Sequence, residues 1–500
     1  MRIFEIILLL AVTVLPFVKR PVLQRISPTY LIAFLGFLLA VHFIFEGWRW
    51  QMIPVYLLTL ILAWRIKVVD PDHSPRLSLL RLTGFFGMTL LLVVGWILPM
   101  ALPVFSLPEP RGSYSVGTEM IHVETGQDEL ISSDPNDQRE LMLKIWYPSN
   151  ADVSSLKGET YLDYANRSGF AVKYGLPPGA LEYLNGVATY AYTGIPVADE
   201  SFPVLLFSHG YGSKAHGYYG ILTEIASRGY IIINMNHSYE SLGATFPDGH
   251  VAHFDFDYQN EITVGSMPVI QPLIDAFKND LSYQDRHVIV RETSLNYFEG
   301  RIQDRWAKDM IVILDLLEKW NGEGLLKGKM DLNKVGVFGH SVGGGSAGNL
   351  AMKDDRIKAA VNLDGIQWGP KIDSAYQIPY LYVSADWPAD HEDINSHVYK
   401  YKSTDYFYET KLLKSGHPNF MDIPFMIPVQ SLAGTGEIDP YLGTEIVTEL
   451  VSTFFDKHLK NVTDADLEKV VDQYDLLEMT VFKGDSIAKN SKVEKTLTLN

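Results

Sequence analysis

The sequence predicts an α/β protein with a mostly parallel sheet flanked by helices, preceded by about four transmembrane helices. Short apolar runs alternate with helical patterns through residues 107–500, as in a parallel sheet wrapped by helices. Residues 1–106 are mostly apolar, which favours membrane helices over a soluble core. A Gly-x-Ser-x-Gly run around Ser341 separates a strand-like segment from a helix-like one. We therefore expect a membrane region at 1–106 and one α/β domain at 107–500.

The N-terminal region contains four apolar stretches, at Ile3–Val18, Tyr30–Trp48, Met52–Ile66 and Leu80–Phe105. The second and fourth are long enough to cross a bilayer, whereas the first and third are short. A cleaved signal peptide is the alternative for the first, but no small-residue cleavage site follows it. The stretches show no paired charges, which favours a plain anchor over a transport module.

The loops between these stretches differ in charge. The second loop has only Arg49 against Glu46, whereas the first and third are basic, with Lys19, Arg20, Arg25, Arg65, Lys67, Arg76 and Arg81. Basic loops stay in the cytoplasm. We therefore expect a multi-pass protein with both termini and the large C-terminal domain on the extracytoplasmic side.

After a Pro/Gly break at Ser106–Gly112, six apolar runs predict strands. A long pattern with three- and four-residue spacing predicts a helix at Arg301–Asn321. The strand runs are Leu141–Pro148, Phe202–Gly212, Tyr230–His237, Lys334–His340, Lys358–Gly365 and Ile378–Asp386. Parallel sheets bind ligands at the carboxyl ends of their strands, so the residues that end these runs are the candidate site residues.

Composition excludes several classes of function. The net charge of −17 argues against a nucleic-acid partner, which requires a basic face. The chain has no cysteine, which excludes disulfides, thiolate catalysis and cysteine-ligated metals. His391 and His397 are six positions apart among acidic residues, but without a third ligand we expect a solvated loop there. No metal or organic cofactor is expected.

Ser341 follows a strand-like run and precedes a helix-like one, as a nucleophile elbow requires. A serine hydroxyl needs a histidine to take its proton, and a carboxylate orients that histidine. In doubly wound hydrolases the chain order is Ser, acid, His. We choose His417, in the loop "LLKSGHPNFMD", as the base. Asp364 and Asp386 each end a predicted strand, and spacing does not separate them.

An ester-cleaving site also needs donors for the developing oxyanion. One should be the amide of Val342, directly after the nucleophile. The second should come from the turn after an earlier strand, and "FSHGYG" supplies it with the amide of Tyr211. His209, just before that turn, is expected to brace the loop.

Four motifs in the expected order resemble the platelet-activating factor acetylhydrolase family of the α/β-hydrolase superfamily. They are "PVLLFSHG" at Pro203–Gly210, "GHSVGG" at Gly339–Gly344, "NLDGIQW" at Asn362–Trp368 and "HPNFMDI" at His417–Ile423. The resemblance extends in patches from Gly112 to Lys460. It implies an α/β-hydrolase fold with Ser341, Asp364 and His417 as catalytic triad, and it favours Asp364 over Asp386. It also supports the Tyr211 and Val342 amides as oxyanion donors.

The resemblance implies hydrolysis of short or oxidised acyl esters of phospholipids, without a need for calcium. The chain departs from the family pattern at Val342, where members have Phe, and at Pro418, where members have Gln. The N-terminal membrane region has no counterpart in the secreted enzyme. We therefore expect a membrane-tethered serine ester hydrolase acting on short-chain or lipid-like esters. The rivals are a polyesterase, a dienelactone hydrolase or a peptidase on the same scaffold, and a non-catalytic membrane receptor.

Overall fold

The computed structural model describes residues 1–18, 26–68, 79–132, 134–279, 281–369, 376–387, 397 and 406–483. The chain divides into two compact units. The first is Met1–Ser106 together with Glu182–Val187 and Phe425–Ala433, and the second is Leu107–Leu181, Ala188–Pro424 and Gly434–Asn500. Two short segments of the expected 107–500 domain thus cluster with the N-terminal helices. One such contact is the stacking of Phe105 on Phe425, with ring centroids 6.3 Å apart.

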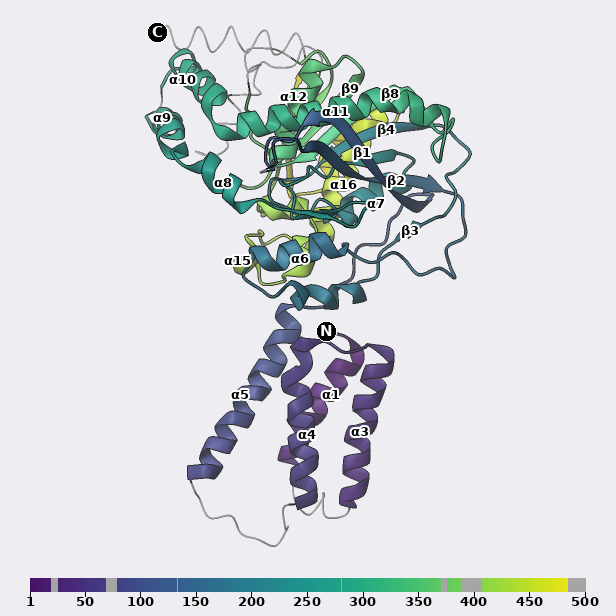
Figure 1. Cartoon of the computed structure of the whole chain (residues 1–500), viewed down its shortest axis with the longest axis vertical. Coiled ribbons are helices and arrows are strands. Elements are labelled where there is room, and N and C mark those ends of the chain that lie inside the picture. Colours follow the sequence, from purple (N-terminus) through teal and green to yellow (C-terminus); the bar gives the residue numbers. More distant parts are fainter. Residues whose placement is uncertain are drawn as a thin grey trace. The chain divides into compact units, whose positions relative to one another are not determined.

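Four helices form the body of the first unit and pack beside one another (Figure 1): α1 (Ile3–Val14), α3 (Pro28–Phe45), α4 (Ile53–Val68) and α5 (Leu79–Ala101). Within the described ranges, three segments are long and apolar enough to cross a membrane, at Pro28–Phe45, Trp50–Val68 and Leu82–Ala101. Ile3–Phe17 is shorter. The third expected stretch is thus longer than predicted, because the 3-10 turn η2 (Trp50–Met52) leads directly into α4.

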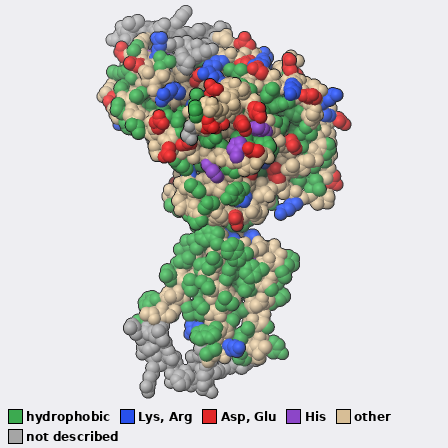
Figure 2. Space-filling view, viewed as in Figure 1, with side chains coloured by type: hydrophobic (Ala, Val, Ile, Leu, Met, Phe, Trp, Pro, Cys, Tyr) green, Lys and Arg blue, Asp and Glu red, His purple; other side chains and the backbone are tan. Residues whose placement is uncertain are grey.

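The surface of these helices is apolar. Phe37, Leu60 and Leu90 are each at least 60% exposed, and Figure 2 shows hydrophobic side chains covering the visible face of this part of the chain. A soluble protein rarely exposes an apolar surface of this extent, and a lipid environment accommodates it.

Charged residues at the ends of these helices form ion pairs that the sequence pattern did not indicate. Glu5 and Arg49 are buried and lie 2.7 Å apart, and Arg2 approaches Glu5 to 2.7 Å. His42 lies 3.0 Å from Glu46. Arg49 stands 44 positions after Glu5, so only the packing of the helices brings the two charges together. The basic residues Lys19, Arg20, Arg25 and Arg76 lie outside the described residues.

The second unit is built on a ten-stranded sheet with the order β12-β11-β10-β9-β8-β4-β5-β2-β1-β3. The strands from β11 to β5 in this order are parallel, whereas β12 is antiparallel to β11 and β2 is antiparallel to both β5 and β1. At the far edge, β3 pairs with β1 in parallel. Their bounds are β1 (Ser115–Asp128), β2 (Gln138–Ser149), β3 (Ala191–Thr193), β4 (Phe202–Ser208), β5 (Ile231–Asn234), β8 (Met330–His340), β9 (Ile357–Leu363), β10 (Tyr380–Ser384), β11 (Tyr406–Leu412) and β12 (Leu477–Lys483). The mostly parallel sheet is confirmed.

Helices cover both faces of this sheet (Figure 1). On one face, Met310 of α11 joins the core cluster of Val335 and Val337 of β8. On the other, Gly336 abuts Phe455 of α16. The described helices of residues 107–500 are α6 (Tyr164–Lys173), α7 (Tyr219–Ser227), α8 (Phe256–Thr263), α9 (Ser266–Lys278), α10 (Tyr283–Asn296), α11 (Phe298–Gly322), α12 (Val342–Lys353), α14 (Ile423–Met426), α15 (Gln430–Ala433), α16 (Pro440–His458) and α17 (Leu467–Gln473). Of these, α15 and the last two residues of α14 belong to the first unit. Short elements complete the chain: η1 (Leu15–Phe17), η3 (Pro178–Gly186), η4 (His417–Phe420), and the paired strands β6 (Gly243–Thr245) and β7 (Val251–His253).

Candidate active site

Ser341 is the single residue between β8 and α12, and its backbone is strained. Its φ of 58° and ψ of −127° lie in a region that a residue with a side chain rarely adopts. Gly339 and Gly343 allow the tight turn. A Cβ on Gly343 would lie 2.2 Å from the Ser208 carbonyl oxygen, and one on Gly339 would lie 2.3 Å from the Gly343 carbonyl oxygen. The turn therefore presents Ser341 at the carboxyl edge of the sheet, as a nucleophile elbow does.

Asp364 directly follows β9, and both of its carboxylate oxygens accept hydrogen bonds. His417 Nδ1 lies 2.6 Å from Asp364 Oδ2. The amide of Ala385 and the indole Nε1–H of Trp387 each donate to Asp364 Oδ1 at 2.8 Å. A carboxylate accepts only, so Nδ1 of His417 carries the proton and Nε2 is left to serve as a base. The Asp364 side chain is fully buried, while that of His417 is 34% exposed.

Asp386 has different partners. It accepts a hydrogen bond from the amide of Lys414 at 2.8 Å and lies 3.4 Å from the Lys411 ammonium. Its own amide donates to the Ser415 carbonyl oxygen. These contacts brace the segment between β11 and η4. His417 is the first residue of η4. The structure thus brings His417 to Asp364 and not to Asp386.

His340 and Tyr218 connect the elbow to its neighbours, and sequence reasoning missed both. His340 Nε2 lies 3.1 Å from the His417 carbonyl oxygen, and its Nδ1 lies 3.1 Å from the Tyr218 hydroxyl. Burial lowers the pKa of His340 well below its usual range, so the ring is neutral. It donates from Nε2 and accepts from Tyr218 at Nδ1. His417 is therefore fixed by its carbonyl to the residue before Ser341.

The turn after β4 lies against Ser341. The amide of Gly210 donates to the Tyr218 hydroxyl at 2.9 Å, and a Cβ on Gly210 would lie 3.3 Å from Ser341 Cβ. The amides of Tyr211 and Val342 have no acceptor among the described residues. These two residues directly follow Gly210 and Ser341, which lie against each other, so their amides are the candidates for an oxyanion hole.

The His417 loop is anchored to α7 by Asp422. Its carboxylate accepts from the amides of Tyr219 and Gly220 at 2.7 and 3.0 Å, where the helix N-terminus favours negative charge. Burial raises the pKa of Asp422 to about 6. This contact ties the segment after His417 to the N-terminus of α7, and the sequence pattern did not assign Asp422 this role.

Ser208, His237 and Asp309 form a hydrogen-bonded string behind the turn that follows β4, and sequence reasoning missed it. Ser208 Oγ lies 2.9 Å from His237 Nε2, and His237 Nδ1 lies 2.7 Å from Asp309 Oδ2. Arg139 donates two hydrogen bonds to the Asp309 carboxylate, from Nε and Nη2, each at 2.7 Å. Burial alone would raise the pKa of Asp309, but the charge and hydrogen bonds of Arg139 outweigh it and lower that pKa.

All three residues of this string are completely buried, and Trp306 stacks on His237 with centroids 4.0 Å apart. His209 accepts a hydrogen bond from the His237 amide and lies 2.7 Å from the Gly210 carbonyl oxygen. His209 is thus part of the framework under the turn, as the sequence suggested.

The expected solvated loop around His391 and His397 is wrong for His397. That ring is 4% exposed, stacks on Tyr283 with centroids 4.3 Å apart and lies 3.2 Å from His287. Tyr283 and His287 belong to α10, whose packing the sequence pattern did not reveal. His391 lies outside the described residues.

The chain is similar in sequence to known proteins. A family model described as platelet-activating factor acetylhydrolase, isoform II, matches residues 101–478. A platelet-activating factor acetylhydrolase of Cavia porcellus is 23% identical over 400 residues, covering 74% of this chain and 81% of that protein. A probable 1-alkyl-2-acetylglycerophosphocholine esterase of Arthroderma benhamiae is 24% identical over 370 residues, covering 68% and 82%.

Among solved structures, a ferulic acid esterase from Streptomyces cinnamoneus superposes with a TM-score of 0.59 at 23% identity. It covers 76% of this chain and 100% of that one, which supports the α/β-hydrolase fold. The curated relatives named here are an acetylhydrolase and an esterase, and the chain is an ester-hydrolysing enzyme. Since the family model spans well over half of the 500 residues, the chain belongs to the platelet-activating factor acetylhydrolase, isoform II, family.

Proposed function

We propose that this protein is a membrane-anchored serine esterase whose triad is Ser341, His417 and Asp364. The observation that carries the proposal is the 2.6 Å hydrogen bond between His417 Nδ1 and Asp364 Oδ2. The histidine of that pair is fixed through its carbonyl to the residue preceding the strained Ser341. A base oriented by a buried carboxylate beside a serine at an elbow is the arrangement that serine acyl transfer needs.

In the proposed mechanism, Ser341 Oγ attacks the ester carbonyl carbon while His417 Nε2 takes its proton. The oxyanion of the tetrahedral intermediate accepts hydrogen bonds from the Tyr211 and Val342 amides. His417 then returns the proton to the leaving alcohol, which leaves an acyl-enzyme. Water repeats the attack with His417 as base, and Asp364 stabilises the imidazolium in both halves.

The proposed substrates are short-chain or lipid-like esters, of which phospholipids with a short acyl group are one class. Family membership supports this, since the named relatives include acetylhydrolases. Val342 stands where the family motif has Phe. It packs with Ile302 and Trp306 in a small apolar cluster, against which Tyr211 and Phe298 lie. The smaller side chain beside the nucleophile leaves more room for the acyl group.

The membrane placement is a second part of the proposal. The apolar helices of the first unit would anchor the protein as four spans, with the short α1 as one of them. The basic residues of the first and third loops favour the cytoplasm for those loops, and the hydrolase domain would then face the extracytoplasmic side.

Labelling with a fluorophosphonate tests the nucleophile. The full-length protein should label once, and Ser341→Ala should abolish labelling. Ser346→Ala is the matched control, because Ser346 lies one turn along α12 and donates to the Val342 carbonyl oxygen at 2.8 Å. It should label normally. A p-nitrophenyl ester series from acetyl to palmitoyl then measures the acyl preference. Equal labelling of Ser341→Ala and wild type would refute the assignment.

A further inference from the structure

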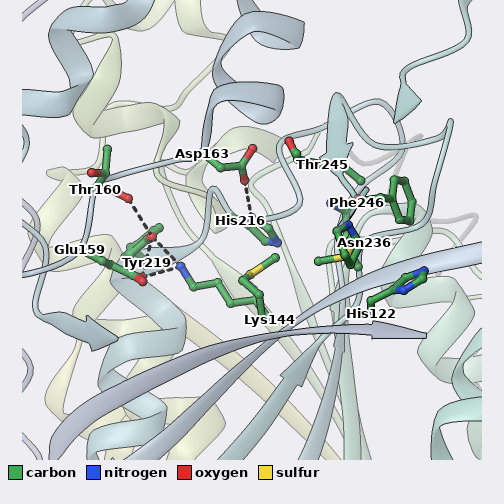
Figure 3. Close-up of a pocket in the computed structure, with 14 residues that line it drawn as sticks. His122, Lys144, Glu159, Thr160, Asp163, His216, Tyr219, Asn236, Thr245 and Phe246 are labelled. Atoms are coloured by element: carbon green, nitrogen blue, oxygen red, sulfur yellow. Dashed lines mark hydrogen bonds and ion pairs between the residues drawn. The ribbon is translucent and has the colours of Figure 1, made fainter. Parts of the chain in front are cut away.

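A cavity of about 450 Å³ lies beyond the carboxyl end of β5, over the face of β1 and β2 (Figure 3). Ser341, Asp364 and His417 are not among the residues that line it. Its walls come from β1, β2, the residues leading into α6, the loop between β4 and α7, and β6. The volume is in the range of small-molecule sites, which combine apolar walls with a few placed polar groups.

Two buried polar atoms in the wall have no hydrogen-bond partner among the described residues: Asn236 Oδ1 and His216 Nε2. Asn236 is completely buried, and His216 is 3% exposed. A buried polar atom without a partner is costly in a folded protein. Two of them lining one cavity indicate that the cavity has an occupant that supplies their hydrogen bonds.

The contacts of these residues determine what each atom offers. Asn236 Nδ2 donates to the Gly243 carbonyl oxygen at 3.1 Å, so Oδ1 is an acceptor. His216 Nδ1 lies 2.8 Å from Asp163 Oδ2. Burial alone would raise the pKa of Asp163, but its hydrogen bonds and charge interaction with His216 and the amide of Asn166 lower it to about 2. The carboxylate therefore accepts from Nδ1, and a hydroxyl group can pair with Nε2 either as donor or as acceptor.

The charges around the cavity are already paired with one another. The Lys144 ammonium donates to Glu159 and, at 2.7 Å, to the Tyr219 hydroxyl. Asp163 is paired with His216. Within the described ranges, no three His, Asp or Glu side chains converge to hold a metal ion. The site therefore suits an uncharged molecule that brings hydroxyl groups, which both donate and accept hydrogen bonds.

We propose that this cavity binds a small neutral diol with a short apolar tail. One hydroxyl pairs with His216 Nε2 and the other donates to Asn236 Oδ1. The tail lies along Met120, Met142 and Phe246, which also line the cavity. The site is separate from the proposed triad, and the proposal does not rest on the hydrolase activity.

Isothermal titration calorimetry with butyl glyceryl ether tests this on the full-length protein in mildly alkaline buffer. This probe is a diol with no ester bond. Butyl propyl ether is the paired ligand, because it has the same skeleton with both hydroxyls replaced by hydrogen. We expect saturable 1:1 binding of the diol, and binding of the ether weaker by at least about tenfold, since both polar atoms stay unpaired. Absence of diol binding, or equal binding of the ether, overturns the proposal.

A pair of variants locates the binding. Thr245 lines the cavity from an exposed position on β6, so Thr245→Phe should fill the space and weaken diol binding at least about tenfold. His253→Phe is the matched control, because His253 is exposed on the paired strand β7 and does not line the cavity. It should bind as wild type does. If Thr245→Phe binds the diol normally, the site is elsewhere and the proposal fails. The comparison of the two ligands on wild type decides the matter even if a variant does not fold.

Discussion

Both oxygens of the Asp364 carboxylate accept hydrogen bonds, one from His417 and the other from Ala385 and Trp387. Asp386 instead braces a loop through Lys414 and Lys411. Asp364→Asn should lower kcat/KM for p-nitrophenyl acetate by about 10⁴-fold, because an amide no longer holds the reactive tautomer of the histidine. Asp386→Asn should stay within about tenfold of wild type. The reverse ranking would make Asp386 the acid.

Single residues could be predicted only where a local pattern carries them. Ser341 lies in a Gly-x-Ser-x-Gly motif whose tight turn requires the two glycines. Five consecutive residues are therefore enough to predict the nucleophile. Asp364 and Asp386 both end strands, and what separates them is the contact with His417, which lies 53 positions after Asp364. Tyr218 and His340 were missed because their roles depend on hydrogen bonds between segments 122 positions apart.

At the scale of elements, the close packing of β8, the elbow and α12 on the end of β4 leaves no space for a methyl group. A Cβ on Gly343 would lie 2.2 and 2.3 Å from the carbonyl oxygens of Ser208 and His209. Gly343→Ala should therefore displace the elbow from the oxyanion turn and lower kcat/KM by about 100-fold. Gly322→Ala, where a Cβ meets nothing within 4 Å, serves as control. An unchanged rate in Gly343→Ala would show that the two elements can separate at no cost.

The end of α16 packs against β11 through His458, whose Nε2 lies 3.1 Å from the Tyr408 hydroxyl. Burial, aided by the charge of Lys457, lowers the pKa of His458 from 6.5 to about 4. The unfolded chain therefore takes up this proton first as the pH falls, so stability decreases from pH 6.5 down to about 4 and this contribution is constant below that. Above pH 6.5 the neutral ring contributes in full.

Urea unfolding of wild type and His458→Gln across this pH range measures the effect. The wild-type midpoint should fall more steeply than that of the variant between pH 6.5 and 4. The other ring neighbours are the aromatic side chains of Tyr406 and Phe454. Parallel curves for the two proteins would mean that His458 does not titrate in this way.

The elements that the sequence predicted are those buried on both faces. Each of the six apolar runs contains or overlaps an observed strand, from β2 to β10. The edge strand β12, and β1 next to the other edge strand β3, were missed because exposure of one face mixes polar residues into them. β11 was missed although "YFYETKL" has alternating aromatic residues that could have indicated it. The pairing order of the sheet depends on long-range contacts that no local pattern contains.

At the scale of the whole molecule, the proposed orientation can be tested because the chain contains no cysteine. Single cysteines can be placed at Lys67, exposed near the end of α4, and at Glu323, exposed after α11. A membrane-impermeant maleimide applied to intact cells should label Glu323→Cys, and should label Lys67→Cys only after permeabilisation. Labelling in the opposite pattern would invert the topology.

The buried string of Ser208, His237 and Asp309 has a consequence for recognising enzymes by shape. A search that matches only residue types and contacts would select this string, because its hydrogen bonds of 2.9 and 2.7 Å are as ordinary as the 2.6 Å bond between His417 and Asp364 of the proposed triad. The string is sealed beneath Trp306 and closed by Arg139, so no ester can reach its hydroxyl. Access of the substrate, more than the identity of three side chains, distinguishes a reaction centre from a structural support.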